Sequence, residues 1–246
     1  MSIRVLFEDD DMIAVDKPPG LATHATLDPK RDHLSAQVRE HLYAHRRAHL
    51  AGRGDASKVY LGEHHRLDRD TSGVIVFAKT ERANPGLSRA FKEHLATKSY
   101  LALTGAFTRA DARWQTRNFL ADDGKSGRVR AVRSGGKTAI TDFELLAHSV
   151  TACLVLARPL TGRRHQIRAH LAEHARAILG DPTYFDPTVD PGPLAPAAPR
   201  LMLHAWKLAL PHPISGDPLE IRAPLPADFI AVARARGLEL GSVCES

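Results

Sequence analysis

The feature that most constrains the fold is the segment from His64 to Ala78, in which a polar, turn-forming loop runs directly into a short apolar stretch. The stretch from Val74 to Ala78 is rich in β-branched side chains, which predicts a buried strand. Thr71-Ser72-Gly73 is the turn that enters this strand. Asp68 is therefore expected on a loop at the end of a core strand, where a rigid scaffold usually presents reactive groups.

The residues of this loop alone leave two interpretations open. One of the carboxylates of Asp68 and Asp70 can cap a turn while the other pairs with a flanking arginine at the surface. Alternatively, one of them is a catalytic group. The local sequence does not choose between the two.

Length and composition restrict the class of protein. The chain has 246 residues, which is enough for the core of one domain or of two small ones. It carries 34 Lys and Arg against 28 Asp and Glu, a formal charge of +6, which favours a polyanionic partner but is shared by many unrelated proteins. The only cysteines, Cys153 and Cys244, do not indicate a disulfide framework. Without a signal-like or membrane-spanning apolar stretch, we expect a cytoplasmic protein.

Hydrophobic periodicity predicts a chain of mixed elements. They are strands at 3–7 and 12–16, a helix at 34–50, a strand at 74–78, a helix at 87–96, a strand at 98–103, an exposed hairpin at 122–137, strands at 138–146 and 151–158, a helix at 163–175, strands at 201–210 and 219–223, and a helix from 227. Two interpretations of Tyr100 stay open: either the strand at 98–103 lies beside that at 74–78 and places Tyr100 near Asp68, or Tyr100 is a half-buried strand tyrosine.

Two basic segments are candidates for contacts with RNA. In the hairpin, Arg128, Arg130 and Arg133 alternate, which fits either an RNA-binding finger or an edge strand protected by charge. In the helix at 163–175, which Thr161 can cap, Arg164 and Arg168 are four residues apart and are expected to share a face. Such a helix start suits an RNA phosphate or a buried carboxylate.

Five segments of the chain recur in the order found in one known family. They are Lys17-Pro18-Pro19-Gly20-Leu21, the stretch from His65 to Gly73, Lys98-Ser99-Tyr100, the stretch from Gly162 to Arg168, and Leu179-Gly180-Asp181. With them the chain resembles the RluA-type pseudouridine synthases, which isomerise uridine within RNA. The resemblance implies an α+β fold in which residues 1–246 form a single catalytic domain, with a mixed, mainly antiparallel sheet flanked by helices. No S4-type RNA-binding domain is expected ahead of it.

The resemblance also implies roles for individual residues. Asp68 is the essential carboxylate, which either attacks the ribose or removes its 2′ proton. Arg66 enters the space left by the flipped uridine, and Arg168 is the partner of Asp68. Tyr100 stacks on the uracil, and Ile167 covers the other side of the ring. Further contacts with RNA are expected from Lys98, Arg164, His165, Arg128 and Arg130, while His65 holds the loop.

The implied reaction needs neither a cofactor nor a metal, because no redox step or external group takes part. The expected partner is a structured RNA, such as a stem-loop of rRNA or tRNA. The protein is expected to be a monomer without a protein partner.

Three other chemistries fit parts of the sequence. His170-Leu171-Ala172-Glu173-His174 matches the H-x-x-E-H pattern of inverted zinc peptidases, but no third ligand stands out downstream. Asp70-Thr71-Ser72-Gly73 faintly resembles an aspartic peptidase loop, although the second such loop is absent. A non-catalytic RNA-binding protein on the same scaffold remains a third interpretation, against which the intact Asp68 argues.

Overall fold

A computed structural model describes residues 3–25, 32–47, 56–106, 112–124, 127–173, 176–184 and 198–241. The chain divides into two compact units. The first unit comprises Met1–Ala96 with Lys207–Ala223, and the second comprises Thr97–Trp206 with Pro224–Ser246.

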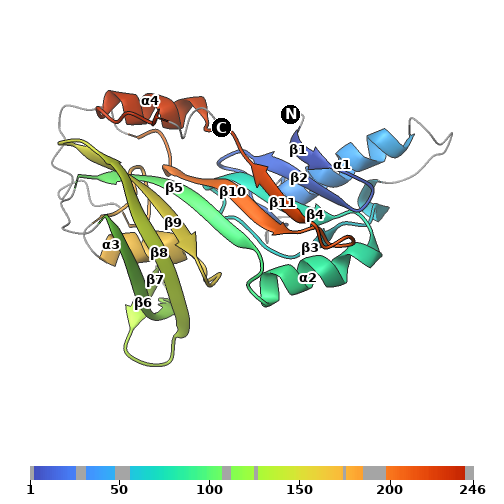
Figure 1. Ribbon diagram of the computed structural model, residues 1–246, viewed down its shortest axis with the longest axis horizontal. Helices are drawn as coiled ribbons and strands as arrows, with labels where there is room; N and C mark the ends of the chain where they lie inside the picture. The colour runs from blue at the N-terminus through green and yellow to red at the C-terminus, as the bar shows by residue number, and fades with distance from the viewer. Residues whose placement is uncertain are drawn as a thin grey trace. The chain divides into compact units, whose positions relative to one another are not determined.

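The first unit is built on antiparallel strands (Figure 1). Strand β2 (Met12–Lys17) pairs with β1 (Arg4–Glu8) on one side and with β4 (Ser72–Ala78) on the other, and the short β3 (Gly62–Glu63) also pairs with β4. All seven residues of β4 are buried, which confirms the predicted core strand. The loop that carries Asp68 therefore runs into one of the most buried strands of the unit.

Helices and a second hairpin complete the first unit. Helix α1 (Leu34–Arg47) buries its predicted apolar face, and residues 48–50 of the predicted helix lie outside the described part of the chain. Helix α2 (Asn84–Lys92) begins three residues before the predicted start, because Pro85 occupies its first turn, where proline is favoured. The remaining elements are the short helices η1 (Ala56–Lys58) and η2 (Glu81–Ala83) and a hairpin in which β10 (Leu203–Pro211), from Lys207 onward, pairs with β11 (Pro218–Arg222).

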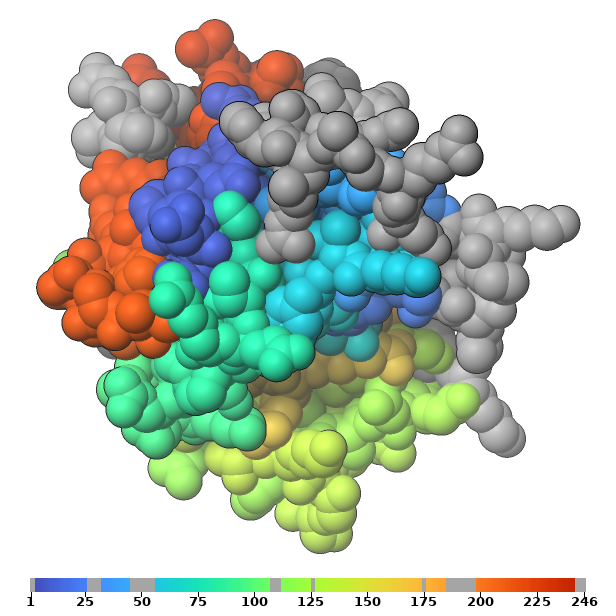
Figure 2. All heavy atoms as spheres, turned by 90° about the vertical axis from the view of Figure 1, so that its right-hand side faces the viewer, coloured from blue at the N-terminus to red at the C-terminus, as the bar shows by residue number. Residues whose placement is uncertain are grey.

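The two hairpins of the first unit lie side by side. Figure 2 shows β1 and β2 in dark blue next to the orange hairpin of β10 and β11. His212 joins them through an ion pair of its Nε2 with Asp9 Oδ2 at 2.7 Å. Asp9 also stabilises the turn between β1 and β2, because its Oδ1 accepts from the N–H groups of Asp11 and Met12 at 2.8 Å.

The second unit contains an antiparallel sheet in the order β5-β9-β8-β6-β7 (Figure 1). Its strands are β5 (Thr97–Gly105), β6 (Arg113–Asp122), β7 (Val129–Val132), β8 (Lys137–His148) and β9 (Ala152–Pro159). Helix α3 (Gln166–Glu173) packs on one face of this sheet, with Ala169 against Leu120, Val129 and Ala139. Helix α4 (Ala227–Ala235) adds Phe229 and Val232 to the larger core.

Three expectations about this unit are wrong in detail. Strand β5 was expected beside the strand at 74–78. It pairs instead with β9, and the N–H of its Leu103 donates to the carbonyl oxygen of Met202 in the segment before β10. The strand β6 was absent from the predicted elements, because two of its four inward residues between Trp114 and Leu120 are the polar Thr116 and Asn118. Helix α3 begins at Gln166 instead of Arg163, and residues 174–175 lie outside the described chain.

The fold class is as predicted. The pairs β1–β2, β2–β4, β5–β9, β6–β8 and β8–β9 are antiparallel, an isolated bridge between Ala22 and His33 is parallel, and helices flank the strands. In the described residues, no helix is both long enough and apolar enough to cross a membrane.

Candidate active site

The loop that carries Asp68 is fastened to a neighbouring segment at Thr23. The Thr23 hydroxyl donates to the carbonyl oxygen of Leu67 at 2.9 Å and accepts from the Leu67 N–H at 3.2 Å. On the other side of Asp68, the Thr71 N–H donates to the Asp68 carbonyl oxygen at 3.2 Å. The backbone on both sides of the carboxylate is thus hydrogen-bonded.

A buried lysine, Lys17, binds the backbone of the same loop. The Lys17 side chain is 0% exposed, and its ammonium donates to the carbonyl oxygens of Pro18, Leu21 and Arg69, each at 2.8 Å. A buried ammonium needs such acceptors because an unsatisfied charge in the interior is costly. Lys17 therefore joins the end of β2 to the residue that follows Asp68.

Two histidines precede the motif and have separate contacts. His65 Nε2 accepts from the Val76 N–H at 3.0 Å, and its ring stacks on Phe91 with centroids 4.4 Å apart. These contacts support the expectation that His65 holds the loop. His64 Nε2 lies 2.9 Å from Asn84 Oδ1, and burial lowers the pKa of His64.

The two carboxylates of the loop have different surroundings. Asp70 accepts from Arg69 Nε at 3.1 Å, and the Arg69 side chain is 54% exposed, so this is the surface pair considered above. Asp68 is half-buried, between the fully buried Leu67 and the exposed Arg69. Arg66 is exposed on the same loop.

In the second unit, Arg168 forms a buried ion pair that the sequence analysis did not assign. Arg168 Nε and Nη2 donate to Oδ2 and Oδ1 of Asp181, each at 2.7 Å, and both residues are almost fully buried. Asp181 Oδ1 also accepts from the N–H groups of Thr183 at 2.8 Å and Tyr184 at 3.1 Å. Asp181 thus fixes the guanidinium of Arg168. The signal for it was available in the segment Leu179-Gly180-Asp181, to which no role was given.

The expected substrate-binding residues of this unit share one core. Tyr100 on β5 is partly buried and packs against the hydrophobic cluster that contains Ile167, which is 6% exposed. Lys98 lies two residues earlier on β5, and burial lowers its pKa. Tyr100, Ile167 and Arg168 are thus all placed by β5 and α3 of the second unit.

Gln166 organises the loop before α3. Its Oε1 accepts from the Thr161 hydroxyl at 2.7 Å and from the Arg163 N–H at 3.0 Å, while its Nε2 donates to Ile140 O and Thr141 Oγ1 at 2.9 Å. These bonds hold residues 161–165 outside the helix, which is why Thr161 does not cap it as predicted.

Of the residues expected to contact RNA, Arg164 is engaged in contacts within the protein. Arg164 precedes α3, so the expectation that it shares a helical face with Arg168 is wrong. Its Nη1 pairs with Asp122 Oδ1 at 2.6 Å, and its Nη2 bonds to the Gly127 carbonyl oxygen.

The other three expected contacts lie around the hairpin. His165, at φ +51°, meets Tyr184 edge-on, with ring centroids 5.8 Å apart. Arg128 is exposed, with its guanidinium 6.0 Å from the centre of the Tyr184 ring. Arg130 is exposed on β7, and Arg133 follows that strand.

The zinc-peptidase pattern has a structural explanation. His170 is 0% exposed, and its Nδ1 and Nε2 lie 2.9 Å from Thr141 Oγ1 and Asn118 Oδ1, respectively. Glu173 accepts from Asn118 Nδ2 at 2.6 Å. Both ring nitrogens of His170 therefore bond to protein groups, and His174 lies outside the described residues. Within the described ranges, no group of three His, Cys, Asp or Glu side chains could hold a metal ion.

Comparisons with known proteins point to one family. A family model described as RNA pseudouridylate synthase matches residues 11–173. The chain is 31% identical over 247 residues to ribosomal large subunit pseudouridine synthase D of Neisseria meningitidis serogroup B, which covers 98% of this chain and 63% of that protein. It is 34% identical over 251 residues to the protein of the same name from Nitrosomonas europaea, covering 98% and 67%. The chain thus spans about two thirds of the length of these relatives.

The fold of the chain is also similar to that of a solved structure. The chain resembles the solved structure of human RNA pseudouridylate synthase domain containing 4, with a TM-score of 0.73 and 24% identity over 96% of this chain and 94% of that one. This likeness confirms the expected pseudouridine synthase fold.

Proposed function

The chain belongs to the RNA pseudouridylate synthase family, and on that premise we propose that it converts specific uridines of structured RNA to pseudouridine, with Asp68 as the essential carboxylate. The observation that carries the proposal is the fixed position of Asp68. Lys17 and Thr23 bind the backbone of its two neighbours, whereas Asp70 is engaged at the surface. A loop held in this way can present one carboxylate to a substrate with little loss of conformational entropy.

The proposed reaction is an isomerisation. The bond between ribose C1′ and uracil N1 breaks, the uracil turns, and a bond from C1′ to C5 forms. The C5 proton is removed, and N1 gains a proton. Asp68 either attacks the ribose or takes its 2′ proton. A uridine stacked in RNA must first be flipped out, at a cost of a few kcal/mol, and Arg66 is exposed on the loop where it can enter the vacated space.

We assign the rest of the site to side chains of β5 and α3. Tyr100 stacks on the uracil, which contributes about 1–3 kcal/mol per stacked base. Ile167 covers the other side of the ring and keeps water from the transient species. Arg168 pairs with Asp68 and stabilises its charged form. Its guanidinium is suited to this because the bidentate contact with Asp181 already fixes its orientation.

The proposal extends to the partner and the state of the protein. We propose that both units act as one catalytic domain, that the protein is a cytoplasmic monomer, and that the RNA is a stem-loop of rRNA or tRNA. Large-subunit rRNA is the first substrate to test, because the two relatives described above are named as ribosomal large subunit pseudouridine synthases.

The deciding experiment compares two carboxylates of one loop. Wild type, Asp68→Asn and Asp70→Asn are incubated with unmodified transcripts of large-subunit rRNA and of tRNAs, and pseudouridine is quantified by mass spectrometry. We expect Asp68→Asn to form none and still to bind RNA, because the amide keeps the size but loses the charge. Asp70→Asn retains most of the activity.

Two results would contradict the proposal. Full activity of Asp68→Asn with loss of activity in Asp70→Asn would show that the wrong carboxylate was assigned. RNA binding without pseudouridine formation by the wild type on every transcript would favour a non-catalytic RNA-binding protein.

A further inference from the structure

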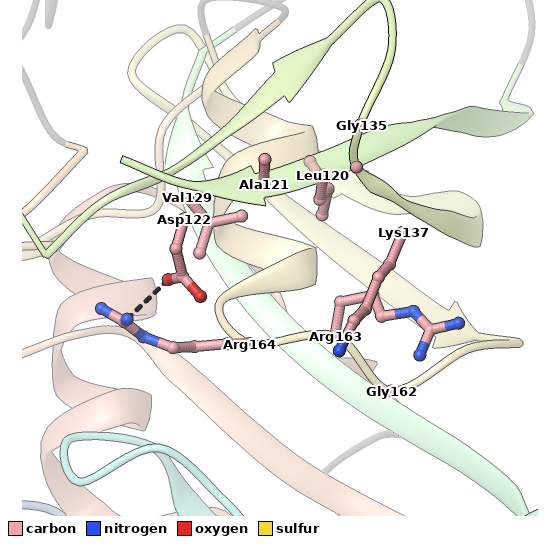
Figure 3. A pocket seen from close by; sticks show the side chains of 10 residues that line it. Leu120, Ala121, Asp122, Val129, Gly135, Lys137, Gly162, Arg163 and Arg164 are labelled. Carbon is pink, nitrogen blue, oxygen red and sulfur yellow. Dashed lines mark hydrogen bonds and ion pairs between the residues drawn. The ribbon is translucent and has the colours of Figure 1, made fainter. Parts of the chain in front are cut away.

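The second unit contains a pocket between the β6–β7 hairpin and the loop before α3 (Figure 3). Its volume is about 450 Å³. The walls come from the end of β6, the turn into β8 and residues 162–164, and the lining includes Leu120, Val129, Gly136, Lys137, Arg163 and Arg164. Three segments that are distant in sequence thus enclose one space.

The charges around this pocket do not cancel. Asp122 is the single acidic residue of the lining, and it is paired with Arg164 at 2.6 Å. The other two cations are Lys137 and Arg163. Among the described residues, the Lys137 ammonium makes no hydrogen bond or ion pair, and the Arg163 guanidinium bonds to the Thr138 carbonyl oxygen through Nε at 2.9 Å. Among the residues that the structure describes, these two positive charges have no acidic partner.

The charged side chains that line the pocket lie in two groups. In Figure 3, Lys137 and Arg163 lie next to each other beside Gly162, while the Asp122–Arg164 pair lies on the other side. Neighbouring cations repel each other, and an anion between them removes that repulsion. The guanidinium of Arg163 also offers planar N–H donors that match phosphate oxygens.

The backbone of the turn shapes the pocket. Gly135 has φ +77°, which favours glycine, and a Cβ on Gly136 would lie 2.7 Å from Val132 Cγ2 and 2.9 Å from Leu120 O. A side chain at Gly136 would therefore displace Val132 or the backbone of Leu120, and the part of the wall formed by Gly135 and Gly136 carries no side chain. The remaining volume accommodates a phosphate together with part of its nucleotide.

We propose that this pocket binds a phosphodiester group of the RNA substrate, with Lys137 and Arg163 as its ligands and the Asp122–Arg164 pair as a neutral wall. The proposal rests on the proposed function, because the ligand is a phosphate of the same RNA at a distance from the target uridine. It replaces Arg164 as the expected RNA contact with two residues that the sequence analysis did not single out.

The test measures RNA binding in the Asp68→Asn background, so that no turnover occurs. The probe is a labelled fragment of large-subunit rRNA, and its association constant K is measured between 50 and 300 mM KCl. Removal of one phosphate contact lowers the slope of log K against log salt by about 0.7–0.9. We expect this full decrease in the magnitude of the slope for the double variant, because both residues bind the same phosphate, and a smaller decrease for Lys137→Gln and for Arg163→Gln.

Two matched controls keep the result specific. Arg164→Gln/Asp122→Asn removes the ion pair but leaves the net charge of the pocket unchanged, and its slope should equal that of the parent. Arg234→Gln removes one exposed positive charge from α4 and should also leave the slope unchanged. Circular dichroism confirms that each variant is folded.

The outcomes distinguish this inference from the proposed function. An active wild type whose double variant keeps the slope of the Arg234→Gln control overturns the pocket and leaves the synthase proposal intact. Altered slopes with no pseudouridine formed by the wild type support the pocket and overturn the synthase. Saturable binding of uridine 5′-monophosphate that is lost in the double variant, with unchanged RNA slopes, assigns the pocket to a free nucleotide and overturns the RNA contact.

Discussion

The guanidinium of Arg168 and the carboxylate of Asp181 meet in two parallel hydrogen bonds of 2.7 Å, and both groups are excluded from solvent. Removing one member of a buried pair takes from the other its bidentate partner, which typically costs about 3–5 kcal/mol. We therefore expect Asp181→Asn to lower the free energy of unfolding by about this amount. Urea denaturation measures it.

A second pair of the same geometry provides the control. Arg200 Nε and Nη2 donate to Asp228 at 2.6 and 2.7 Å, but the Asp228 side chain is 40% exposed. Solvent screens this pair, so Asp228→Asn should cost about 1 kcal/mol or less. Equal losses in the two variants would show that burial does not decide the contribution of the Arg168 pair.

The residue before Asp181 is constrained in two ways. Gly180 has φ +69°, and a Cβ placed on it would lie 1.9 Å from the carbonyl oxygen of Arg200. Gly216 has φ +80° but no atom within 4 Å of the added Cβ. Gly216→Ala should therefore cost only the backbone strain of about 1–2 kcal/mol. Gly180→Ala should exceed it by at least about 2 kcal/mol, as measured by thermal unfolding. Similar losses at both positions would contradict the close approach to Arg200.

Lys17 is expected to stabilise the Asp68 loop rather than to act in chemistry. Lys17→Met leaves the carbonyl oxygens of Pro18, Leu21 and Arg69 without this donor, and each unsatisfied group costs about 1–3 kcal/mol. We expect a total loss of about 3 kcal/mol or more and faster hydrogen exchange at the Leu67 and Thr71 amides.

A lysine at the surface serves as the matched control for Lys17→Met. Lys58 is exposed in η1, and Lys58→Met should change the stability by less than about 0.5 kcal/mol. Unchanged exchange rates in the loop of Lys17→Met would show that Lys17 does not hold it.

His64 should make stability dependent on pH. Burial lowers the pKa of His64 in the folded state, despite the opposing hydrogen bond with Asn84. Below the ordinary histidine pKa of about 6.5, the unfolded chain binds the proton first, so the folded state loses stability as the pH falls from that value towards the lower folded pKa. The stability of wild type relative to His64→Gln should therefore be greater at pH 7.5 than at pH 5.5. An identical difference at the two pH values in urea titrations would refute this assignment.

Local sequence patterns were sufficient to predict a strand or a helix where the apolar positions repeat without interruption. The strand at Ser72–Ala78 and the helix at Leu34–Arg47 follow directly from β-branched runs and from apolar residues at helical spacing. The motif containing Asp68 was visible for the same reason, because its residues are contiguous. By contrast, β6 escaped prediction because its inward face carries the polar residues Thr116 and Asn118, and Asn118 is bound to His170 of another element.

Only the tertiary structure could decide which distant groups meet. Asp181 is separated by 13 residues from the arginine that it binds, and Lys17 by 52 residues from the Arg69 carbonyl that it holds. The pocket of Lys137 and Arg163 likewise brings together segments that are separated in sequence, and no repeating pattern of residues indicates that they meet. The sequence by itself determined the class of fold, the family and the candidate carboxylate, since these depend on local periodicity and contiguous motifs. The partners of the buried charges depended on chain packing, because each had to find an opposite charge or a carbonyl group wherever the folded chain brought one near.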